Sequence, residues 1–390
     1  MILDTIFPPD PRVENEAATL INSGHEVFLF CLDKGNQKKS EIINGIKIKR
    51  YKFNKLTYKL SALSYDLPFY RMIMKPKISH FIKQNNIDVI HIHDIRIAEA
   101  VFKANKKYKL KTVLDLHDNI PENMKFYPHL NKFPGKYIIS PSKWRKKENE
   151  FILKSDKIIT VSPNFAQDLI EKNNIEPKKV VMVPNTVRQS FYNKAVYSDV
   201  IAKKYSNKFV VLYLGDTNIR RGLLTAIRAT EFLSKEIANY KLVIVGKNTT
   251  DSILKDETKK LNLEAFVDFE GWKDVSLFPS YIVASNVCIS PLYRSVQHDV
   301  AYANKIFQYM SFSKPVLVSN AIAQKEIIEK ANSGLVHEEK NKDDFSSKVL
   351  ELYLNEEKAE ELGKRGKQFI ENEFSWEITS KALVKLYDEL

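Results

Sequence analysis

The sequence predicts an α/β protein of two doubly wound domains, each with a parallel sheet covered by helices. Short apolar segments alternate with amphipathic helical segments along the whole chain, which is typical of parallel strands joined by helices. This alternation pauses once, in the polar and aperiodic stretch 188–207, which we interpret as a linker. A length of 390 residues suits two domains of ordinary size, and 44% hydrophobic with 28% charged residues excludes a disordered chain.

The first half alternates regularly, and its last helix has the clearest start. Ser162 precedes Pro163, which puts an N-cap residue before a proline at the first helical position. We expect strands near 1–6, 26–32, 87–92, 111–116, 157–161 and 179–183. We expect helices near 12–23, 67–84, 96–106, 143–153 and 163–173.

A second alternation follows the linker and predicts another sheet of the same kind. We expect strands near 209–214, 241–245, 265–269, 286–290 and 315–319. We expect helices near 221–236, 250–261, 302–312, 323–331, 342–353, 356–372 and 376–389. The predicted domains are 1–187 and 208–372. Two such domains leave a cleft at the carboxyl ends of their strands, so functional residues are expected on the loops that follow strands.

Several classes of protein are excluded by composition. No apolar run approaches the roughly 18–20 residues of a membrane helix, and the N-terminus lacks the basic start and long apolar core of a signal peptide. Cys31 and Cys288 stand in apolar, strand-like runs far apart in the sequence. We expect both to be buried free thiols, which fits a reducing cytoplasm.

The formal net charge of +13 is concentrated in two places. Region 47–83 interleaves lysines and arginines with aromatic residues and has Asp66 as its one acidic residue, and a second basic cluster at 143–147 includes Trp144. Basic and aromatic residues together suit an anionic membrane surface or a polyphosphate-bearing acceptor. Nucleic acid would also suit them, and so would a simple solvated surface.

The segment 298–320 is the most informative stretch of the sequence. A polar loop runs into Asn304-Lys305, a short helix follows, and Lys314-Pro315 then leads into an apolar strand. This order puts Lys305 and backbone N–H groups at a helix start, where anions bind. Gln308 is expected about one turn further on, on the same face.

Two loops of the first half carry candidate functional residues. Arg12 follows the first strand, where it could clamp a phosphate, although Asp10 and Pro11 equally well just begin the helix. His117 lies between Asp115 and Asp118 after a strand, where a neutral imidazole could hydrogen-bond a sugar hydroxyl.

A histidine pair in the first half resembles a set of metal ligands. His91 and His93 alternate along a predicted strand and are followed by Asp94. Because the pair alternates within a strand, we favour structural packing over metal binding.

The second half opens with a loop suited to a diphosphate. Gly215 follows the strand 209–214, and Arg220, Arg221 and Gly222 then stand at a helix start. Supporting positions on the next two loops are Gly246, Gly271 and Trp272.

These segments together resemble the family-4 retaining glycosyltransferases with the GT-B fold, and in particular an Asn-Lys subgroup of bacterial and archaeal surface-polysaccharide glycosyltransferases. The resemblance covers nearly the whole chain, is weakest across 40–80, and rests on Val183-Pro184-Asn185, Arg221-Gly222, Asn304-Lys305, Tyr309-Met310, Lys314-Pro315-Val316 and Phe374-Ser375-Trp376. It implies two Rossmann-like domains facing a central cleft, the first on the acceptor side and the second binding the donor. Segment 373–390 would form a helix that packs back on the first domain.

The resemblance also implies roles for the loop residues. His117 would contact the donor sugar, while Arg221 and Lys305 would stabilise the departing diphosphate, which makes these three the candidate catalytic residues. The candidate donor-binding residues are Arg12, Gly215, Arg220, Gly246, Gly271, Trp272, Asp299, Asn304 and Gln308. No metal and no cofactor is expected, because basic side chains and helix dipoles neutralise the phosphates.

Some positions depart from the pattern of the family. Gln308 stands in place of a glutamate that binds ribose, Val300 in place of another glutamate, Asp216 in place of a basic residue and Ala303 in place of a proline. The loss of the charge-assisted bond at Gln308 would weaken ribose binding by about 1 kcal/mol.

The sequence therefore predicts a retaining glycosyltransferase that moves a sugar from a nucleotide-diphosphate donor to a lipid-linked or surface-polysaccharide acceptor. The alternative is an inactive GT-B relative that binds a nucleotide sugar or a partner glycosyltransferase. An epimerase of the same fold is disfavoured by Asn304-Lys305, and nucleic acid is the less favoured partner. We expect a cytoplasmic protein that associates with an anionic membrane through region 47–83.

Overall fold

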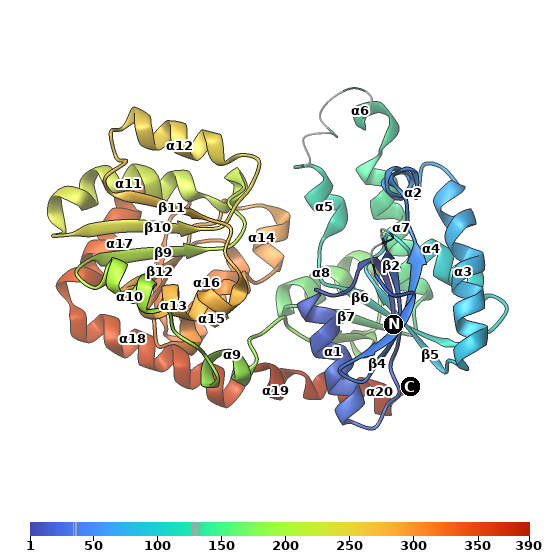
Figure 1. The fold of residues 1–390 in the computed structure, drawn as a ribbon. Coiled ribbons are helices and arrows are strands. Elements are labelled where there is room, and N and C mark those ends of the chain that lie inside the picture. The colour runs from blue at the N-terminus through green and yellow to red at the C-terminus, as the bar shows by residue number, and fades with distance from the viewer. Residues whose placement is uncertain (34, 36, 127–129, 131–132, 134) are drawn as a thin grey trace. The chain divides into compact units, whose positions relative to one another are not determined.

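The computed structural model describes residues 1–33, 35, 37–126, 130, 133 and 135–390 (Figure 1). Contacts divide the chain into two compact units. Unit 1 comprises Met1–Pro184 together with Ser380–Leu390, and unit 2 comprises Asn185–Thr379. The division therefore falls close to the predicted end of the first domain at 187, and it splits the predicted C-terminal segment 373–390 after Thr379.

Unit 1 is built on an eight-stranded sheet with the order β3-β4-β2-β1-β5-β6-β7-β8. All neighbours in this sheet are parallel except β3 and β4. The strands are β1 (Ile2–Ile6), β2 (Phe28–Asp33), β3 (Ser40–Ile43), β4 (Ile46–Lys52), β5 (Val89–His93), β6 (Lys111–Leu116), β7 (Lys157–Thr160) and β8 (Val180–Met182). The six strands predicted for the first half are thus confirmed to within two residues at each end.

The helices of unit 1 lie between these strands, as expected for a doubly wound fold (Figure 1). They are α1 (Pro11–Asn22), α2 (Lys55–Ser61), α3 (Phe69–Asn85), α4 (Ala98–Asn105), α5 (Ile120–Met124), α6 (Gly135–Ile138), α7 (Pro141–Lys154) and α8 (Pro163–Asn173). Ser162 caps α8 as predicted, because its side chain accepts a hydrogen bond from the Phe165 N–H. The final helix α20 (Lys381–Asp388) contacts α1 and β8, which confirms that the chain returns to the first sheet.

The hairpin of β3 and β4 was missed by the sequence analysis. Its turn is Asn44-Gly45, and both residues have positive φ (50° and 82°), as a two-residue hairpin turn requires. Ile46, Ile48 and Arg50 are buried while the residues between them are more exposed, which is the alternation of a half-buried strand. The basic character of this stretch hid the alternation.

Unit 2 is built on a six-stranded, fully parallel sheet with the order β11-β10-β9-β12-β13-β14. The strands are β9 (Phe209–Leu214), β10 (Tyr240–Val245), β11 (Val267–Gly271), β12 (Val287–Ser290), β13 (Val316–Ser319) and β14 (Gly334–His337). The first five were predicted. The edge strand β14 was not, because four residues beginning with glycine carry no strand pattern.

Helices cover both faces of the second sheet (Figure 1). They are α11 (Leu223–Glu236), α12 (Asp251–Lys260), α13 (Phe278–Val283), α14 (Val296–Val300), α15 (Lys305–Ser311), α16 (Ile322–Ala331), α17 (Lys342–Leu354), α18 (Glu356–Phe369) and α19 (Trp376–Thr379). Along β9, Leu212 and Leu214 belong to one apolar cluster, whereas Val211 and Tyr213 belong to another. This alternation places a core on each face of the sheet.

The stretch 188–207 is not irregular chain. It contains two short helices, α9 (Gln189–Asn193) and α10 (Asp199–Tyr205), and it belongs to unit 2. Ile201 and Tyr205 are buried one turn apart on α10. A helix of two turns is too short to produce a visible periodicity, which explains the error.

Two further expectations concern the cysteines and the membrane. Cys31 and Cys288 are both free and buried, as predicted. Among the described residues, no helix combines the length and the apolar character needed to cross a bilayer.

Candidate active site

Three predicted glycines lie side by side at the carboxyl edge of the second sheet. The Gly215 N–H donates to the Val245 carbonyl, and the Gly246 N–H donates to the Gly271 carbonyl, both at 2.8 Å. A Cβ on Gly246 would stand 1.8 Å from the Gly215 carbonyl oxygen, so this close approach requires glycine. The loops after β9, β10 and β11 therefore meet at one edge, as the sequence predicted.

Lys305 projects to this same edge from the first turn of α15. Its Nζ lies 3.5 Å from the centroid of the Tyr213 ring and has no hydrogen-bond partner among the described residues. A Cβ on Gly215 would stand 3.5 Å from that Nζ, so the ammonium group lies against the first glycine loop. Burial and the nearby Arg221 lower the pKa of Lys305 well below its usual value. An anion bound here would supply the missing partner.

The position of Lys305 is fixed by an aromatic residue one turn further along α15. The Tyr309 hydroxyl accepts the Leu214 N–H at 2.8 Å, which holds α15 against the end of β9. The Tyr213 hydroxyl in turn donates to the Asp216 carbonyl at 2.6 Å, which fixes the ring beneath the ammonium group. Sequence reasoning missed Tyr213, because it stands among apolar residues of a buried strand.

Arg221 also stands at this edge, but it has an internal partner. Its Nε lies 3.2 Å from Oδ2 of Asp216, and Oδ1 of Asp216 accepts from the Asn248 amide at 2.6 Å. Gly222 follows with φ of 77°, and a Cβ there would stand 1.7 Å from the Pro291 carbonyl oxygen. Asp216, which stands where the family has a basic residue, thus neutralises part of the charge of Arg221.

The remaining donor-binding candidates differ in their surroundings. Asp299 pairs with Arg294 at 3.1 Å and accepts the Ile322 N–H at 3.1 Å, so it is engaged at the start of α16. Trp272 is 71% exposed, and Asn304 is exposed as well. Gln308 is half-buried on α15, one turn after Lys305.

Arg220 completes the predicted set, since it stands in the short turn before α11. Its N–H donates to the side chain of Asn218 and its carbonyl accepts from the Tyr293 N–H.

The structure gathers Lys305, Arg221 and the three glycines at one edge of the second sheet.

In unit 1, His117 lies between two carboxylates at the carboxyl edge of the sheet. Its Nδ1 is 3.2 Å from Oδ2 of Asp115 and its Nε2 is 3.2 Å from Oδ2 of Asp94. Burial opposes the charged form, but these carboxylates outweigh it and raise the pKa of His117 to about 10. The raised pKa favours the charged form over the neutral imidazole that was expected, because Asp94, remote in sequence, supplies a second carboxylate.

Arg12 is enclosed in unit 1 and fully engaged. Its guanidinium donates to both oxygens of Asp115 at 2.7 Å and to the Val183 carbonyl at 3.2 Å, and it pairs with Glu16 at 2.9 Å. This arrangement argues against the phosphate contact predicted for Arg12. The alternative interpretation of the loop holds, because Asp10 caps α1 by accepting the Val13 N–H at 3.1 Å.

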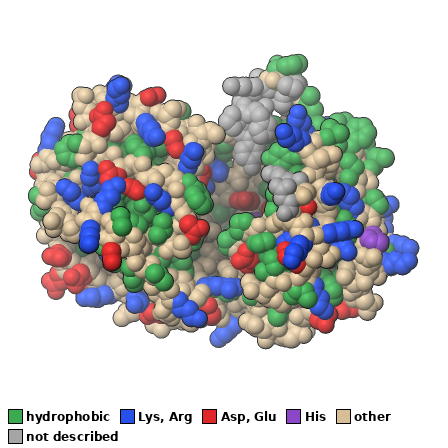
Figure 2. Space-filling view, viewed as in Figure 1, with side chains coloured by type: hydrophobic (Ala, Val, Ile, Leu, Met, Phe, Trp, Pro, Cys, Tyr) green, Lys and Arg blue, Asp and Glu red, His purple; other side chains and the backbone are tan. Residues whose placement is uncertain are grey.

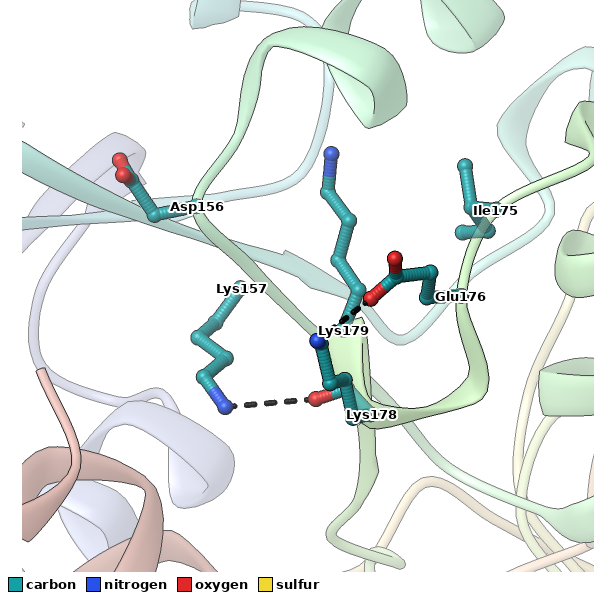
Figure 3. A pocket seen from close by; sticks show the side chains of 6 residues that line it. All are labelled: Asp156, Lys157, Ile175, Glu176, Lys178 and Lys179. Atoms are coloured by element: carbon teal, nitrogen blue, oxygen red, sulfur yellow. Dashed lines mark hydrogen bonds and ion pairs between the residues drawn. The ribbon is translucent and has the colours of Figure 1, made fainter.

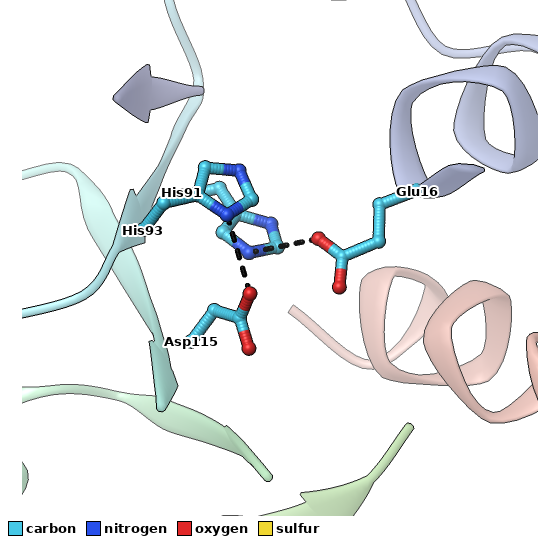
Figure 4. Close-up of side chains that lie close together, drawn as sticks. All are labelled: Glu16, His91, His93 and Asp115. Carbon is cyan, nitrogen blue, oxygen red and sulfur yellow. Dashed lines mark hydrogen bonds and ion pairs between the residues drawn. The ribbon is translucent and has the colours of Figure 1, made fainter. Parts of the chain in front are cut away.

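Glu16, His91, His93 and Asp115 bring four potential metal ligands within 4.8 Å of one another (Figure 4). His91 Nε2 is 3.4 Å from Glu16, and His93 Nδ1 is 3.2 Å from Asp115. Arg12 pairs with both Glu16 and Asp115, so a guanidinium already supplies a cation to these two carboxylates, which argues against a further cation. The preference for structural packing over metal binding stays a prediction, now with a physical reason.

A pocket of about 370 Å³ in unit 1 lies away from these residues (Figure 3). Its lining comes from the starts of β7 and β8 and includes Lys157, Lys178 and Glu176. Lys157 pairs with Glu389 at 3.1 Å, and Lys178 pairs with Glu176 at 2.8 Å. The pocket thus lies at the amino edge, opposite to the edge where ligands of parallel sheets bind.

Asp94 is the residue of unit 1 whose importance the sequence analysis underestimated. It directly follows β5 and has φ of 61°, and burial raises the pKa of its carboxyl to about 7. The signal that could have found it is an acid directly after a buried strand, next to the strand that precedes His117.

Two family models match the chain in succession. The model described as "Glycosyltransferase Family 4" matches residues 12–191, and the model described as "Glycosyl transferases group 1" matches residues 198–369. An uncharacterized glycosyltransferase of Methanocaldococcus jannaschii is 24% identical over 97% of this chain and 93% of its own length. The spore coat protein SA of Bacillus subtilis is 22% identical over 81% and 88%. The capsular polysaccharide biosynthesis glycosyltransferase CapM of Staphylococcus aureus is 22% identical over 59% and 61%.

Solved structures agree with the predicted fold. Sucrose-phosphate synthase from Thermosynechococcus elongatus superposes with a TM-score of 0.77 at 16% identity, over 97% of this chain and 92% of its own. HepE of Anabaena, solved in complex with UDP, superposes with a TM-score of 0.74 at 13% identity, over 100% and 99%. The fold is GT-B. Because the two family models succeed one another along nearly the whole sequence, the chain belongs to the family-4 glycosyltransferases.

Proposed function

We propose that this protein transfers a sugar from a nucleoside-diphosphate donor to a lipid-linked or surface-polysaccharide acceptor, with retention of anomeric configuration. The observation that carries the proposal is the buried and unpartnered Nζ of Lys305 beside Gly215 and Arg221. A desolvated cation without a partner is costly to maintain, and a diphosphate is the anion that the adjoining glycine loops admit. The UDP complex of HepE and the name of CapM support the donor and the acceptor class.

The proposed chemistry is electrostatic. Lys305 and Arg221 stabilise the charge that develops on the departing diphosphate, while the acceptor hydroxyl attacks the same face of the sugar. Two carboxylates flank His117 and raise its pKa, so its proposed role is to orient Asp94 and the donor sugar rather than to accept a proton. The basic groups neutralise the diphosphate themselves, and for that reason we propose that no metal and no cofactor takes part.

The direct test is transfer, or hydrolysis of the donor, by the purified chain. Lys305→Ala and Arg221→Ala are each expected to lower kcat by about 100-fold or more, because each removes charge stabilisation from the transition state. Arg228→Ala is the matched control, since this arginine pairs with Glu257 on the surface of the same unit. Full activity in both site variants would overturn the mechanism.

A second candidate is a GT-B relative that binds a nucleotide sugar without turning it over. The ion pair between Asp216 and Arg221 favours it, as does Gln308 in place of the ribose-binding acid. Thermal shift with UDP, GDP, CDP and ADP detects binding to the folded chain. A clear shift together with no turnover of the matching donor sugars would favour this candidate.

A further inference from the structure

Helix α2 buries its small polar residues and exposes two of its apolar ones, while Leu60 is half-buried. Thr57 and Ser61 are buried, whereas Leu56 is 64% exposed and Tyr58 is 62% exposed. A helix that only covers the core of a globular protein does the opposite, because its apolar face stabilises the fold when it is turned inward. The outward face of α2 is therefore built for something other than the core of unit 1.

The start of α3 extends this exposed apolar surface. Phe69 is 50% exposed and Met72 is 64% exposed, and a spacing of three residues puts them on one face of the helix. Helices α2 and α3 contact each other, and Leu67 in the connection is exposed as well. Figure 2 shows hydrophobic side chains gathered over this part of unit 1. We name Leu56, Tyr58, Leu67, Phe69 and Met72 the α2–α3 patch.

Three lysines beside the patch have no carboxylate partner among the described residues. Lys55 and Lys59 on α2 and Lys75 on α3 are exposed, and no carboxylate of the described residues pairs with any of them. Other basic residues of the two sequence clusters do have partners. These pairs are Lys47 with Glu26, Arg50 with Glu41, Arg71 with Glu99, Lys143 with Asp66 and Arg145 with Glu148. Lys52, Lys83 and Lys146 likewise have no carboxylate partner among the described residues, so what distinguishes Lys55, Lys59 and Lys75 is that they share α2 and α3 with exposed apolar side chains.

We propose that the α2–α3 patch docks on an anionic lipid surface. Leu56, Phe69 and Met72 would enter the boundary between headgroups and acyl chains, while the lysines remain among the headgroups. Each lysine near such a surface strengthens attachment by electrostatic attraction, and aliphatic side chains add apolar burial. Bases are bound by stacking on aromatic rings, and three of the five patch residues, Leu56, Leu67 and Met72, are not aromatic, which favours lipid over nucleic acid. The inference rests on the proposed function only in that a lipid-linked acceptor is met at a membrane.

The test is co-sedimentation of the full chain with lipid vesicles. Vesicles of phosphatidylcholine with about one third phosphatidylglycerol are expected to bind the protein, and vesicles of phosphatidylcholine alone to bind at least about 10-fold less. Lys55→Glu with Lys59→Glu, and separately Leu56→Ser with Met72→Ser, are each expected to reduce binding by about 10-fold or more. High salt should weaken the wild-type interaction, because it screens the lysines.

Matched controls in unit 2 separate docking from general effects of charge and surface. Lys259→Glu with Lys260→Glu makes the same charge change on α12, and Leu354→Ser removes a leucine that is 73% exposed. Both are expected to bind within two-fold of wild type. Equal binding by the site and control variants would overturn the proposal. So would a preference for duplex DNA over vesicles, or a dimer in the ultracentrifuge that the Leu56→Ser and Met72→Ser pair dissolves.

The same variants distinguish this proposal from the proposed function. None of the substituted residues is a candidate catalytic or donor-binding residue, so hydrolysis of a soluble donor should stay at the wild-type rate. Loss of vesicle binding with intact donor hydrolysis supports docking alone. Vesicle binding without any donor hydrolysis supports docking and overturns the proposed activity.

Discussion

The two units both bury charge at the carboxyl edges of their sheets, but the charges are paired in unit 1 and unpaired at Lys305 in unit 2. In unit 1, Arg12, Asp115, His117 and Asp94 are linked to one another by ion pairs. In unit 2, the Nζ of Lys305 is buried against the Tyr213 ring without any hydrogen-bond partner among the described residues. A paired network stabilises its own unit, whereas an unpaired cation stores a cost that an anionic ligand can relieve. We therefore expect the buried charges of unit 1 to need no ligand, whereas an anionic ligand should stabilise unit 2.

The largest effect is expected from a substitution that breaks the paired network of unit 1. Arg12→Ala leaves the carboxylates of Asp115 and Glu16 buried without a cation, so it should lower the free energy of unfolding by about 3–5 kcal/mol. Urea unfolding followed by circular dichroism measures this. The control Arg228→Ala breaks an exposed pair with Glu257 and should cost less than about 1 kcal/mol. Equal costs for the two variants would contradict the comparison.

The second prediction uses pH. The pKa of His117 is raised from 6.5 to about 10, so its contribution to stability is complete below pH 6.5 and is lost as pH rises toward 10. Over that window the folded state holds a proton that the unfolded state releases, which gives a loss of at most about 1.4 kcal/mol per pH unit. The raised pKa values of Glu16 and Asp94, about 8 and 7, act in the same direction.

His117→Gln tests this assignment. Compared with wild type, it should lose stability more slowly between pH 8 and 10, as measured by urea midpoints at each pH. An identical slope in both proteins would show that His117 is not a cation in the folded state.

The third prediction removes the unpaired charge of unit 2. Lys305→Met should raise the free energy of unfolding of the ligand-free protein by about 1–2 kcal/mol, because it removes a desolvated ammonium group. The same variant should abolish the thermal shift caused by a nucleoside diphosphate. Lys314→Met is the matched control, since Lys314 Nζ donates to the carbonyls of Val283 and Ser285. It should destabilise the protein by about 1 kcal/mol and leave nucleotide binding intact.

The smallest effect concerns the partner of Arg221. Asp216→Asn removes the carboxylate 3.2 Å from the guanidinium, so it should tighten binding of a nucleoside diphosphate by roughly 3- to 10-fold. Isothermal titration at low and high salt measures the change, which should shrink as salt screens the charge. Weaker binding would instead show that Asp216 is needed to position Arg221.

The sequence predicted the arrangement of the strands better than the interaction partners of individual charged side chains. The alternation of apolar segments reflects local periodicity, and it located eleven strands that the structure contains. Gly215, Gly246, Lys305 and Arg221 were placed at one edge correctly, because the order of strands and loops determines which edge a loop occupies. The hairpin of β3 and β4 was missed because its basic residues hid the alternation and its Asn44-Gly45 turn was overlooked.

The role of a charged side chain depends on partners that are remote in sequence. Arg12 has the residue type and the loop position of a phosphate ligand, yet its partner Asp115 is 103 residues away. His117 was expected to be neutral because the contribution of Asp94, on the neighbouring strand, was not visible from spacing. Only the three-dimensional arrangement shows which charges are satisfied internally.

The return of the chain to unit 1 has a consequence for biosynthesis. The Tyr387 hydroxyl on α20 lies 2.9 Å from His91 Nδ1, and it thereby completes the buried network. Segment Ser380–Leu390 is translated only after residues 185–379, which takes the ribosome roughly 10–40 s. Throughout that interval the nascent first sheet lacks its last helix and presents an uncovered side of α1 and β8 to chaperones. Unit 2 is therefore a continuous piece of chain, whereas unit 1 can be completed only after all of unit 2 has been translated.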